Sequence, residues 1–446
     1  MKDNDLHYKQ ELMRTLSLGD LVTYGMLYML PIAPFAMYGL LSKASNGMVP
    51  LVYLTSVCVM VFTAHSYMVF SAEFPVAGSV YTYARIGIND TAGFFAGWLI
   101  FLDYILAPGV LAVVSAVAMN SFAPSVPKGM WILIFIALGT VMNLVGLNFT
   151  AKANRLMLWA VLAVLAIDVV SGLVALYGGK GHGHLSFSAF YNPGNFTAAG
   201  LATGVLIGSS NYLGFDAITT LGEEIRENDK RLSGYAGLLT LGAIAILFIG
   251  QTWIAADLAP GATVESPDTA FYDISRYAGG NSLSYLTSLS TALAWGIPCT
   301  IVSQAAITRV IYAMARDRQL PHVLATVSAK TKQPWVANIL VSAVSLGVAL
   351  FFQDHLDELF LFQNFGAFAA YSIVNLSLIF YFAIQRKSAR WISHVALPAI
   401  GFAICVTLLL AMRHATHVLG LTWLGIGAAY FLVMRFMLHR TPLVSP

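Results

Sequence analysis

Long, uninterrupted apolar runs recur along this chain and constrain its fold more than any other feature. A helix needs about 20 consecutive, predominantly apolar residues to cross a bilayer. Runs of that kind occupy twelve windows: 20–42, 48–70, 92–120, 130–149, 153–177, 198–222, 232–257, 283–313, 335–352, 357–383, 394–413 and 417–438. They are too long and too continuously apolar for the alternating strands of a β-barrel. The sequence therefore predicts an all-α membrane protein with about twelve transmembrane helices.

The composition disfavours most soluble classes of protein. Only 10% of the residues are charged and 58% are hydrophobic, whereas soluble domains average about 25% charged residues. The three cysteines have no metal-ligand spacing, and the chain contains no phosphate-binding loop and no zinc-protease motif. We therefore expect a protein of the lipid bilayer that is not an enzyme, with no cofactor, no resident metal and no nucleic-acid partner.

The positive charges predict how the chain is oriented. With the twelve windows as spans, 19 of the 24 Lys and Arg residues fall on one side, and basic loops stay in the cytoplasm. Both termini are therefore expected in the cytoplasm, with the protein in the inner membrane. The windows divide the chain into a cytoplasmic N-terminal segment, a core with two halves and an intervening loop, two additional helices and a cytoplasmic tail: 1–19, 20–383 (halves 20–177 and 198–383), 394–438 and 439–446. Within the core, 258–282 is expected to be an extramembrane loop with a short helix.

Two windows carry residues that break helices. The first contains Pro31 and Pro34, which remove two backbone donors. The sixth contains the small and polar cluster 208–211, followed by Gly214 and Asp216. Glycine and proline are common in transmembrane helices, but breaks in the first and sixth spans are expected if spans one to five and six to ten are inverted repeats. Such repeats hold a substrate near the membrane midplane.

Carboxylates inside the apolar windows are the next candidates for function. An ionisable group within a span is costly, so it normally faces a cavity or a partner. Asp216 is the strongest candidate, and we expect it to bind and release a proton during transport. Alternatively, its carboxylate stabilises the broken helix by accepting hydrogen bonds from backbone N–H groups. Asp103 would contact the substrate or, alternatively, make a bond between helices. We interpret Asp168 as mainly structural, and we expect Glu223 and Glu224 to lie at the cytoplasmic interface and to pair with Arg226 or Arg231.

Aromatic rings beside these acids would contact a cationic substrate, because an ammonium over a ring face gains about 0.5–2 kcal/mol. Together with the polar and backbone groups of the breaks, they complete a set of candidate substrate-binding residues: Tyr28, Pro31, Ala33, Phe35, Asp103, Tyr104, Ser209, Asn211, Gly214, Phe215, Asp216 and Trp295.

Four segments resemble the amino acid–polyamine–organocation superfamily of secondary transporters: 73–84, Leu213–Glu224, Arg309–Asp317 and Asn364–Ala367. The resemblance spans nearly the whole chain, and bacterial putrescine importers look most similar, because they share the GFDA run of the sixth window and the Leu102–Tyr104 stretch. The resemblance implies a LeuT-like five-plus-five inverted repeat with broken helices 1 and 6. It also implies alternating access, commonly with proton symport, and a role for Asp216 in substrate binding and protonation.

Two departures from the family pattern bear on the substrate. The stretch Pro31–Pro34 lacks the glycines that usually present backbone N–H groups to a substrate carboxylate, which favours an amine. Against this, Ala36 stands where the putrescine importers carry an aspartate. The sequence therefore predicts proton-coupled import of a small cationic amine, putrescine-like, by a carrier that uses protons as the coupling ion.

Other functions stay open at this stage. The chain would alternatively be a permease for neutral or cationic amino acids, with Ser209, Ser210 and Asn211 holding the substrate carboxylate. Sodium coupling through Ser303 and Thr308 is a further alternative, as is a transport-dead sensor or a channel-like facilitator.

Overall fold

The computed structural model is helical, apart from an isolated bridge between Leu16 and Ile225. It describes residues 14–74, 79–122, 125–145, 147–226, 231–267 and 269–437, so the predicted terminal segments lie largely outside the described residues. The first half of the chain contains α1 (Leu18–Met29), α2 (Ala33–Ser45), α3 (Val49–Glu73), α4 (Ser79–Gly87), α5 (Asp90–Phe122), α6 (Lys128–Val145), α7 (Leu147–Tyr177) and η1 (Phe187–Ala189).

The second half follows with α8 (Ala198–Ser210), η2 (Asp216–Glu224), α9 (Leu232–Leu258), η3 (Ala259–Gly261), α10 (Ala270–Ala294), η4 (Trp295–Cys299), α11 (Thr300–Arg316), η5 (His322–Ala325), α12 (Trp335–Phe351), α13 (Leu356–Leu378), η6 (Ile379–Gln385), η7 (Ile392–Ala396), α14 (Leu397–Leu410), α15 (His414–Leu432) and η8 (Val433–Met437). Each predicted window contains helix. Among the described residues, however, nine helices are long and apolar enough to span a membrane, or ten if α1 and α2 form one bent span. The shorter α8 and α12 have 13 and 17 residues.

The first window is bent where its prolines predicted a break. Helices α1 and α2 meet at 42°, and α1 ends at Met29, followed by Leu30, whose φ of 53° is positive. Pro31 follows, and Pro34 stands in the first turn of α2, where a missing N–H costs nothing because that donor has no partner within the helix. The break therefore places backbone groups of 30–32 in the middle of the protein.

The sixth window changes helix type in the middle. Helix α8 ends at Ser210, a turn covers 211–215, and the chain continues as the 3₁₀ helix η2. Gly214, with φ of 112°, makes the turn possible because a residue without a Cβ adopts this conformation without strain. The Thr219 and Thr220 hydroxyls each donate to a carbonyl three residues earlier, which satisfies backbone acceptors that an α-helix would have used.

The segment predicted as a loop with a short helix, 258–282, includes the start of α10. This helix begins at Ala270 and is interrupted at Gly280, whose φ is 79°. It then continues through the π-helix η4, which contains Pro298, into α11. The short helix of the prediction is thus the first part of α10, before the kink.

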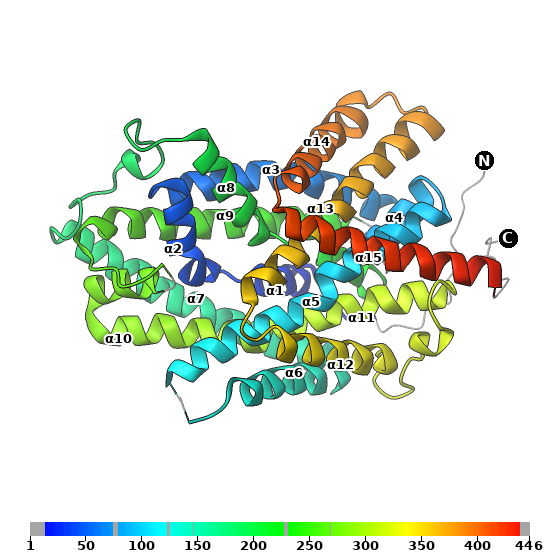
Figure 1. Ribbon diagram of the computed structural model, residues 1–446, viewed down its shortest axis with the longest axis horizontal. Coiled ribbons are helices and arrows are strands. Elements are labelled where there is room, and N and C mark those ends of the chain that lie inside the picture. The colour runs from blue at the N-terminus through cyan, green and yellow to red at the C-terminus, as the bar shows by residue number, and fades with distance from the viewer. Residues whose placement is uncertain are drawn as a thin grey trace.

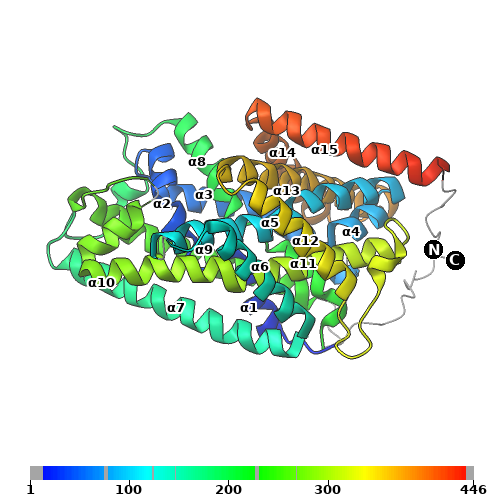
Figure 2. The same ribbon diagram turned by 60° about the horizontal axis from the view of Figure 1, so that its bottom comes forward.

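Helix α5 lies at the centre of the bundle and contacts α13, α11, α6 and α12 (Figure 1). Its apolar window is 78% buried, whereas the window of α15 is only 17% buried. Helices α14 and α15 lie together on one side of the bundle in both views (Figures 1 and 2). Large apolar side chains such as Trp159 and Leu410 are exposed on the outer helices, as expected for surfaces that face lipid.

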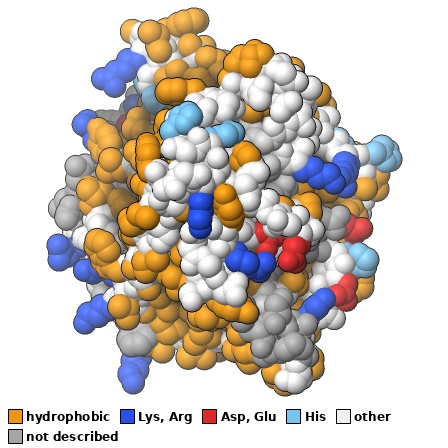
Figure 3. All heavy atoms as spheres, turned by 90° about the vertical axis from the view of Figure 1, so that its left-hand side faces the viewer, with side chains coloured by type: hydrophobic (Ala, Val, Ile, Leu, Met, Phe, Trp, Pro, Cys, Tyr) orange, Lys and Arg blue, Asp and Glu red, His pale blue; other side chains and the backbone are white. Residues whose placement is uncertain are grey.

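The end of the bundle near α2, α7 and α10 is more polar. Figure 3 shows charged and histidine side chains over this face, with hydrophobic side chains gathered along its edges. At the opposite end, Arg85, Arg309 and Arg316 are paired with acids. The bundle is therefore polar at both ends and apolar around its middle, as expected for a multi-pass membrane protein.

Candidate functional site

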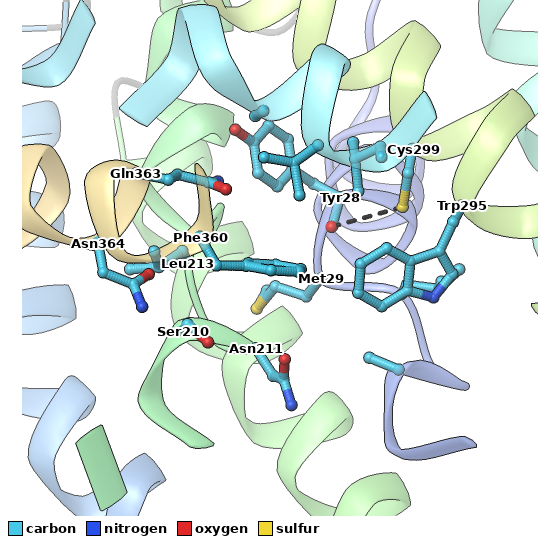
Figure 4. A pocket seen from close by; sticks show the side chains of 15 residues that line it. Tyr28, Met29, Ser210, Asn211, Leu213, Trp295, Cys299, Phe360, Gln363 and Asn364 are labelled. Atoms are coloured by element: carbon cyan, nitrogen blue, oxygen red, sulfur yellow. Dashed lines mark hydrogen bonds between the residues drawn. The ribbon is translucent and has the colours of Figure 1, made fainter. Parts of the chain in front are cut away.

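A small cavity of about 50 Å³ lies between the two broken windows. It is bounded by the end of α1, the turn after α8, the middle of α5, η4 and α13: Tyr28, Met29, Leu30, Ala33, Ala107, Val110, Leu111, Ser210, Asn211, Leu213, Trp295, Cys299, Phe360, Gln363 and Asn364. In Figure 4, Trp295 and Asn364 lie on opposite sides of the Phe360 ring. Of the twelve predicted site residues, Tyr28, Ala33, Asn211 and Trp295 line the cavity.

Several polar atoms around the cavity have no hydrogen-bond partner among the described residues. They are the Tyr28 hydroxyl, Trp295 Nε1 and Asn364 Oδ1, all buried. A buried polar atom without a partner costs about 1–3 kcal/mol, and such atoms in a native structure require an explanation. A small polar ligand in the cavity would satisfy those of them that it reaches.

Asp216 is fully buried and does not line this cavity. Its Oδ2 accepts a hydrogen bond from the Tyr104 hydroxyl of α5, and its Oδ1 accepts one from the Tyr371 hydroxyl of α13 at 2.7 Å. The backbone N–H of Gly214 donates to Oδ1 at 3.2 Å. The predicted residues Tyr104, Gly214 and Asp216 are therefore brought together, with both carboxylate oxygens satisfied by neutral donors.

Asp103 is also fully buried, but it has fewer partners. Its Oδ1 accepts a hydrogen bond of 2.9 Å from Gln363 Nε2, and its Oδ2 has no partner in the described part of the chain. Gln363 lines the cavity, so its amide links the cavity to a buried carboxylate. The sequence interpretation did not single out Gln363, because one glutamine in an apolar span is a weak signal.

The other predicted residues support the broken windows from outside the cavity. The Pro31 carbonyl accepts a hydrogen bond of 2.9 Å from Gln251 Nε2 of α9. This side-chain donor takes the place of the backbone N–H that a continuous helix would supply to the carbonyl. Phe35 stacks on Phe271 with ring centroids 4.4 Å apart.

Ser209 and Phe215 complete this outer set. Ser209 is buried, and its hydroxyl has no partner within the described segments. The Phe215 ring packs against Tyr67 and Tyr371, with centroids 5.7 and 5.5 Å apart. Phe215 thus contacts a tyrosine that holds Asp216, rather than the cavity.

The hydroxyls considered for a sodium site make bonds within α11. Ser303 Oγ donates to the Thr300 carbonyl at 3.1 Å, and Thr308 Oγ1 donates to the Gln304 carbonyl at 2.7 Å.

Two hydrogen bonds join α1 to the segment formed by η4 and α11. The Tyr24 hydroxyl of α1 donates to the Val302 carbonyl at 2.5 Å. Cys299 Sγ donates to the Leu27 carbonyl at 2.7 Å.

At the end of the bundle that carries Arg85, Arg309 and Arg316, two ion pairs hold η2 in place. Glu224 is fully buried and pairs with Arg309, and Glu223 pairs with Arg316 at 3.0 Å. The sequence instead predicted Arg226 or Arg231 as the partner of Glu224, which is wrong, because Glu224 pairs with Arg309 of α11. The correction follows from the 3₁₀ geometry of η2, which turns Glu224 inward against α11. The Glu224 carbonyl also accepts the Leu16 N–H at 3.1 Å, so the segment before α1 covers this end of the site.

Comparison with known proteins places this arrangement in a family. Residues 21–415 match the amino acid permease family. The low-affinity putrescine importer PlaP of Escherichia coli (strain K12) is 31% identical over 431 residues, covering 94% of this chain and 93% of the importer. The branched-chain amino acid permease BcaP of Bacillus subtilis (strain 168) is 26% identical over 454 residues, covering 96% and 94%. The methylthioribose transporter of the same organism is 23% identical, with the same coverage.

Proposed function

Because this chain belongs to the amino acid permease family of membrane transporters and is not an enzyme, we propose that it imports a small cationic amine of the putrescine type by proton symport. The observation that carries this proposal is a pair of buried carboxylates near the cavity, Asp103 and Asp216. Neither takes part in an ion pair within the described residues.

A buried carboxylate without a cation is unfavourable. A substrate ammonium or a proton would each remove this cost, and a carrier of a cationic amine coupled to protons needs both. The ring of Trp295 and that of Tyr28 would contact the apolar part of the amine and its charged end. The similarity to an importer named for putrescine is in line with this assignment.

The transport cycle that we propose is alternating access around the two broken windows. In this scheme, α1 with α2 and α8 with η2 are the broken first and sixth of twelve spans, in a five-plus-five inverted repeat with two further helices. The bent α1–α2 pair and the turn at 211–215 support this division. Both termini would lie in the cytoplasm of the inner membrane, on the side of the ion pairs of Arg309 and Arg316.

An amino-acid substrate is the second candidate. Ser210 and Asn211 line the cavity beside the turn, where they would hydrogen-bond a substrate carboxylate, and a branched-chain permease is among the similar proteins. The stretch after Leu30 contains Pro31 and Pro34 and so offers few backbone N–H groups to an anion. For this reason we favour the amine.

Transport by purified protein in proteoliposomes tests the proposal. Vesicles with an acidic exterior are supplied with radiolabelled putrescine, leucine or lysine. The proposal predicts accumulation of putrescine above its equilibrium level, lost when the pH gradient is dissipated with a protonophore. Accumulation of leucine or lysine without putrescine would assign the chain to the amino-acid alternative. Equilibration without accumulation would indicate a facilitator.

A further inference from the structure

Gln363 stands between the cavity and the buried carboxylate of Asp103. Its side chain lines the cavity, and its Nε2 donates to Asp103 Oδ1 at 2.9 Å. In Figure 4 the Gln363 amide projects from α13 toward the middle of the group of lining residues. A ligand in the cavity that binds Asp103 Oδ1 would therefore compete with this amide.

The packing of α13 on α5 holds Gln363 in this place. One helical turn after Gln363, Gly366 lies against the backbone of α5. A Cβ added there would come within 2.8 Å of the Asp103 nitrogen and 2.7 Å of the Leu99 carbonyl oxygen. The absence of a side chain lets the two helices approach closely, and residues three positions apart lie on the same helix face. The amide over Asp103 is thus a consequence of helix packing.

The bond leaves Asp103 incompletely satisfied. An ionised carboxylate has about four acceptor sites, and here a single neutral N–H occupies one of them, while Oδ2 has no partner in the described ranges. A primary ammonium carries three donors and a positive charge, so it would bind both oxygens more strongly than an amide does. The internal donor to Asp103 is therefore weaker than an ammonium that would displace it.

We propose that Gln363 is the specificity-determining residue of this site: its amide covers Asp103, and only a ligand with a primary ammonium displaces it. The inference deepens the proposed function and rests on it. A neutral ligand gains too little from Asp103 to replace the amide, so the cover selects against ligands without a positive charge. A ligand that cannot break the bond leaves the amide in place and gains nothing from Asp103, and this difference between ligands is the source of the discrimination.

The helices that carry Asp103 and Gln363, α5 and α13, also carry the two tyrosines that bond Asp216. Tyr104 follows Asp103 on α5, and Tyr371 lies two turns beyond Gln363 on α13; both tyrosines donate to Asp216. The proposed ammonium site and the proposed proton site therefore share the two helices α5 and α13.

Binding measurements on the purified full-length protein test the inference. The dissociation constant of radiolabelled putrescine is determined by scintillation proximity for the wild type, Gln363→Met, Asp103→Asn and Asp168→Asn. Methionine has a similar length and cannot donate, so Gln363→Met should tighten putrescine binding about 3- to 10-fold, the effect of one lost competing bond. Asp103→Asn should weaken it about 10- to 100-fold.

Asp168→Asn is the matched control, because Asp168 is a buried carboxylate that bonds Ser275 and lies away from the cavity; it should bind as the wild type does. Unchanged or weaker binding by Gln363→Met overturns the inference, even if Asp103→Asn fails to fold. Wild-type affinity in Asp103→Asn overturns it as well, and leaves the proposed function intact if the wild type accumulates putrescine. A wild type that binds no amine contradicts the proposed function itself.

Discussion

Tyr371 donates a hydrogen bond of 2.7 Å to Oδ1 of Asp216, although the two residues are 155 positions apart in the sequence. The Tyr104 hydroxyl binds the other oxygen, so α5, α13 and η2 meet at one buried carboxylate. The turn at Gly214 brings its own N–H to the same group. Asp216 is thus held by donors from three separate segments, and a change in its charge would alter its hydrogen bonds with all three.

Removing one of these hydroxyls is expected to weaken the site. Tyr371→Phe deletes one donor to Asp216 and should lower the free energy of unfolding by about 1–3 kcal/mol, together with a reduced rate of proton-coupled uptake. Thermal unfolding of the purified protein and uptake in proteoliposomes measure the two effects. Tyr285→Phe is the control, because Tyr285 is 65% exposed; equal stability of the two variants would contradict the role of Tyr371.

A side chain at Gly214 is expected to abolish substrate binding. A Cβ at this position would lie 2.0 Å from Tyr28 Cδ1, and the φ of 112° is strained for any other residue. Gly214→Ala must therefore move Tyr28, which lines the cavity. In Gly242→Ala the new methyl meets nothing within 4 Å, so this variant should bind normally and be slightly more stable, since alanine favours helix by about 1 kcal/mol. Equal binding by both variants would show that the Tyr28 position is not needed.

Breaking the buried ion pair of Arg309 and Glu224 is expected to be strongly destabilising. Glu224→Gln leaves the Arg309 charge without its partner in a fully buried position, and such a change costs about 3–5 kcal/mol. The double variant Glu224→Leu, Arg309→Met removes both charges and should recover part of the loss. Urea or thermal unfolding of the three proteins checks this order, and a single variant as stable as the double variant would refute it.

The glutamine beside the first break is expected to stabilise it. Gln251→Leu leaves the Pro31 carbonyl without its side-chain donor, and an unpaired buried acceptor costs about 1–3 kcal/mol. Thr252→Val is a neighbouring control, because the Thr252 hydroxyl bonds only carbonyls of its own helix. The melting temperatures of the two variants are compared. A larger decrease in Thr252→Val than in Gln251→Leu would argue against a special role for Gln251.

The break in the first window was predictable because its signals are local. Pro31 and Pro34 lie three residues apart in an apolar run, and each acts on the helix that contains it. The length of the apolar windows likewise follows from the thickness of the bilayer. These features depend on neighbouring residues alone, which is why the sequence predicts them.

The partners of the site residues were not predictable in the same way. Gln251 bonds the Pro31 carbonyl and Gln363 bonds Asp103, yet each is one of a few polar residues in a largely apolar helix. Helical periodicity assigns such a residue to a face, but it does not say which helix that face meets. The pairing of Glu224 with Arg309 was missed for the same reason, since it depends on how η2 turns against α11.

In the proposed cycle Asp216 carries the proton that drives uptake, and the Asp216→Asn variant removes this capacity. Wild-type and Asp216→Asn proteins are reconstituted in the same lipid, and putrescine accumulation is measured with an acidic exterior, with Asp168→Asn as the control. Asparagine keeps the size of the side chain and one oxygen that accepts from one of the two tyrosines, but it cannot exchange a proton. We predict that Asp216→Asn loses accumulation above equilibrium while Asp168→Asn retains it; normal accumulation by folded Asp216→Asn would contradict the claim.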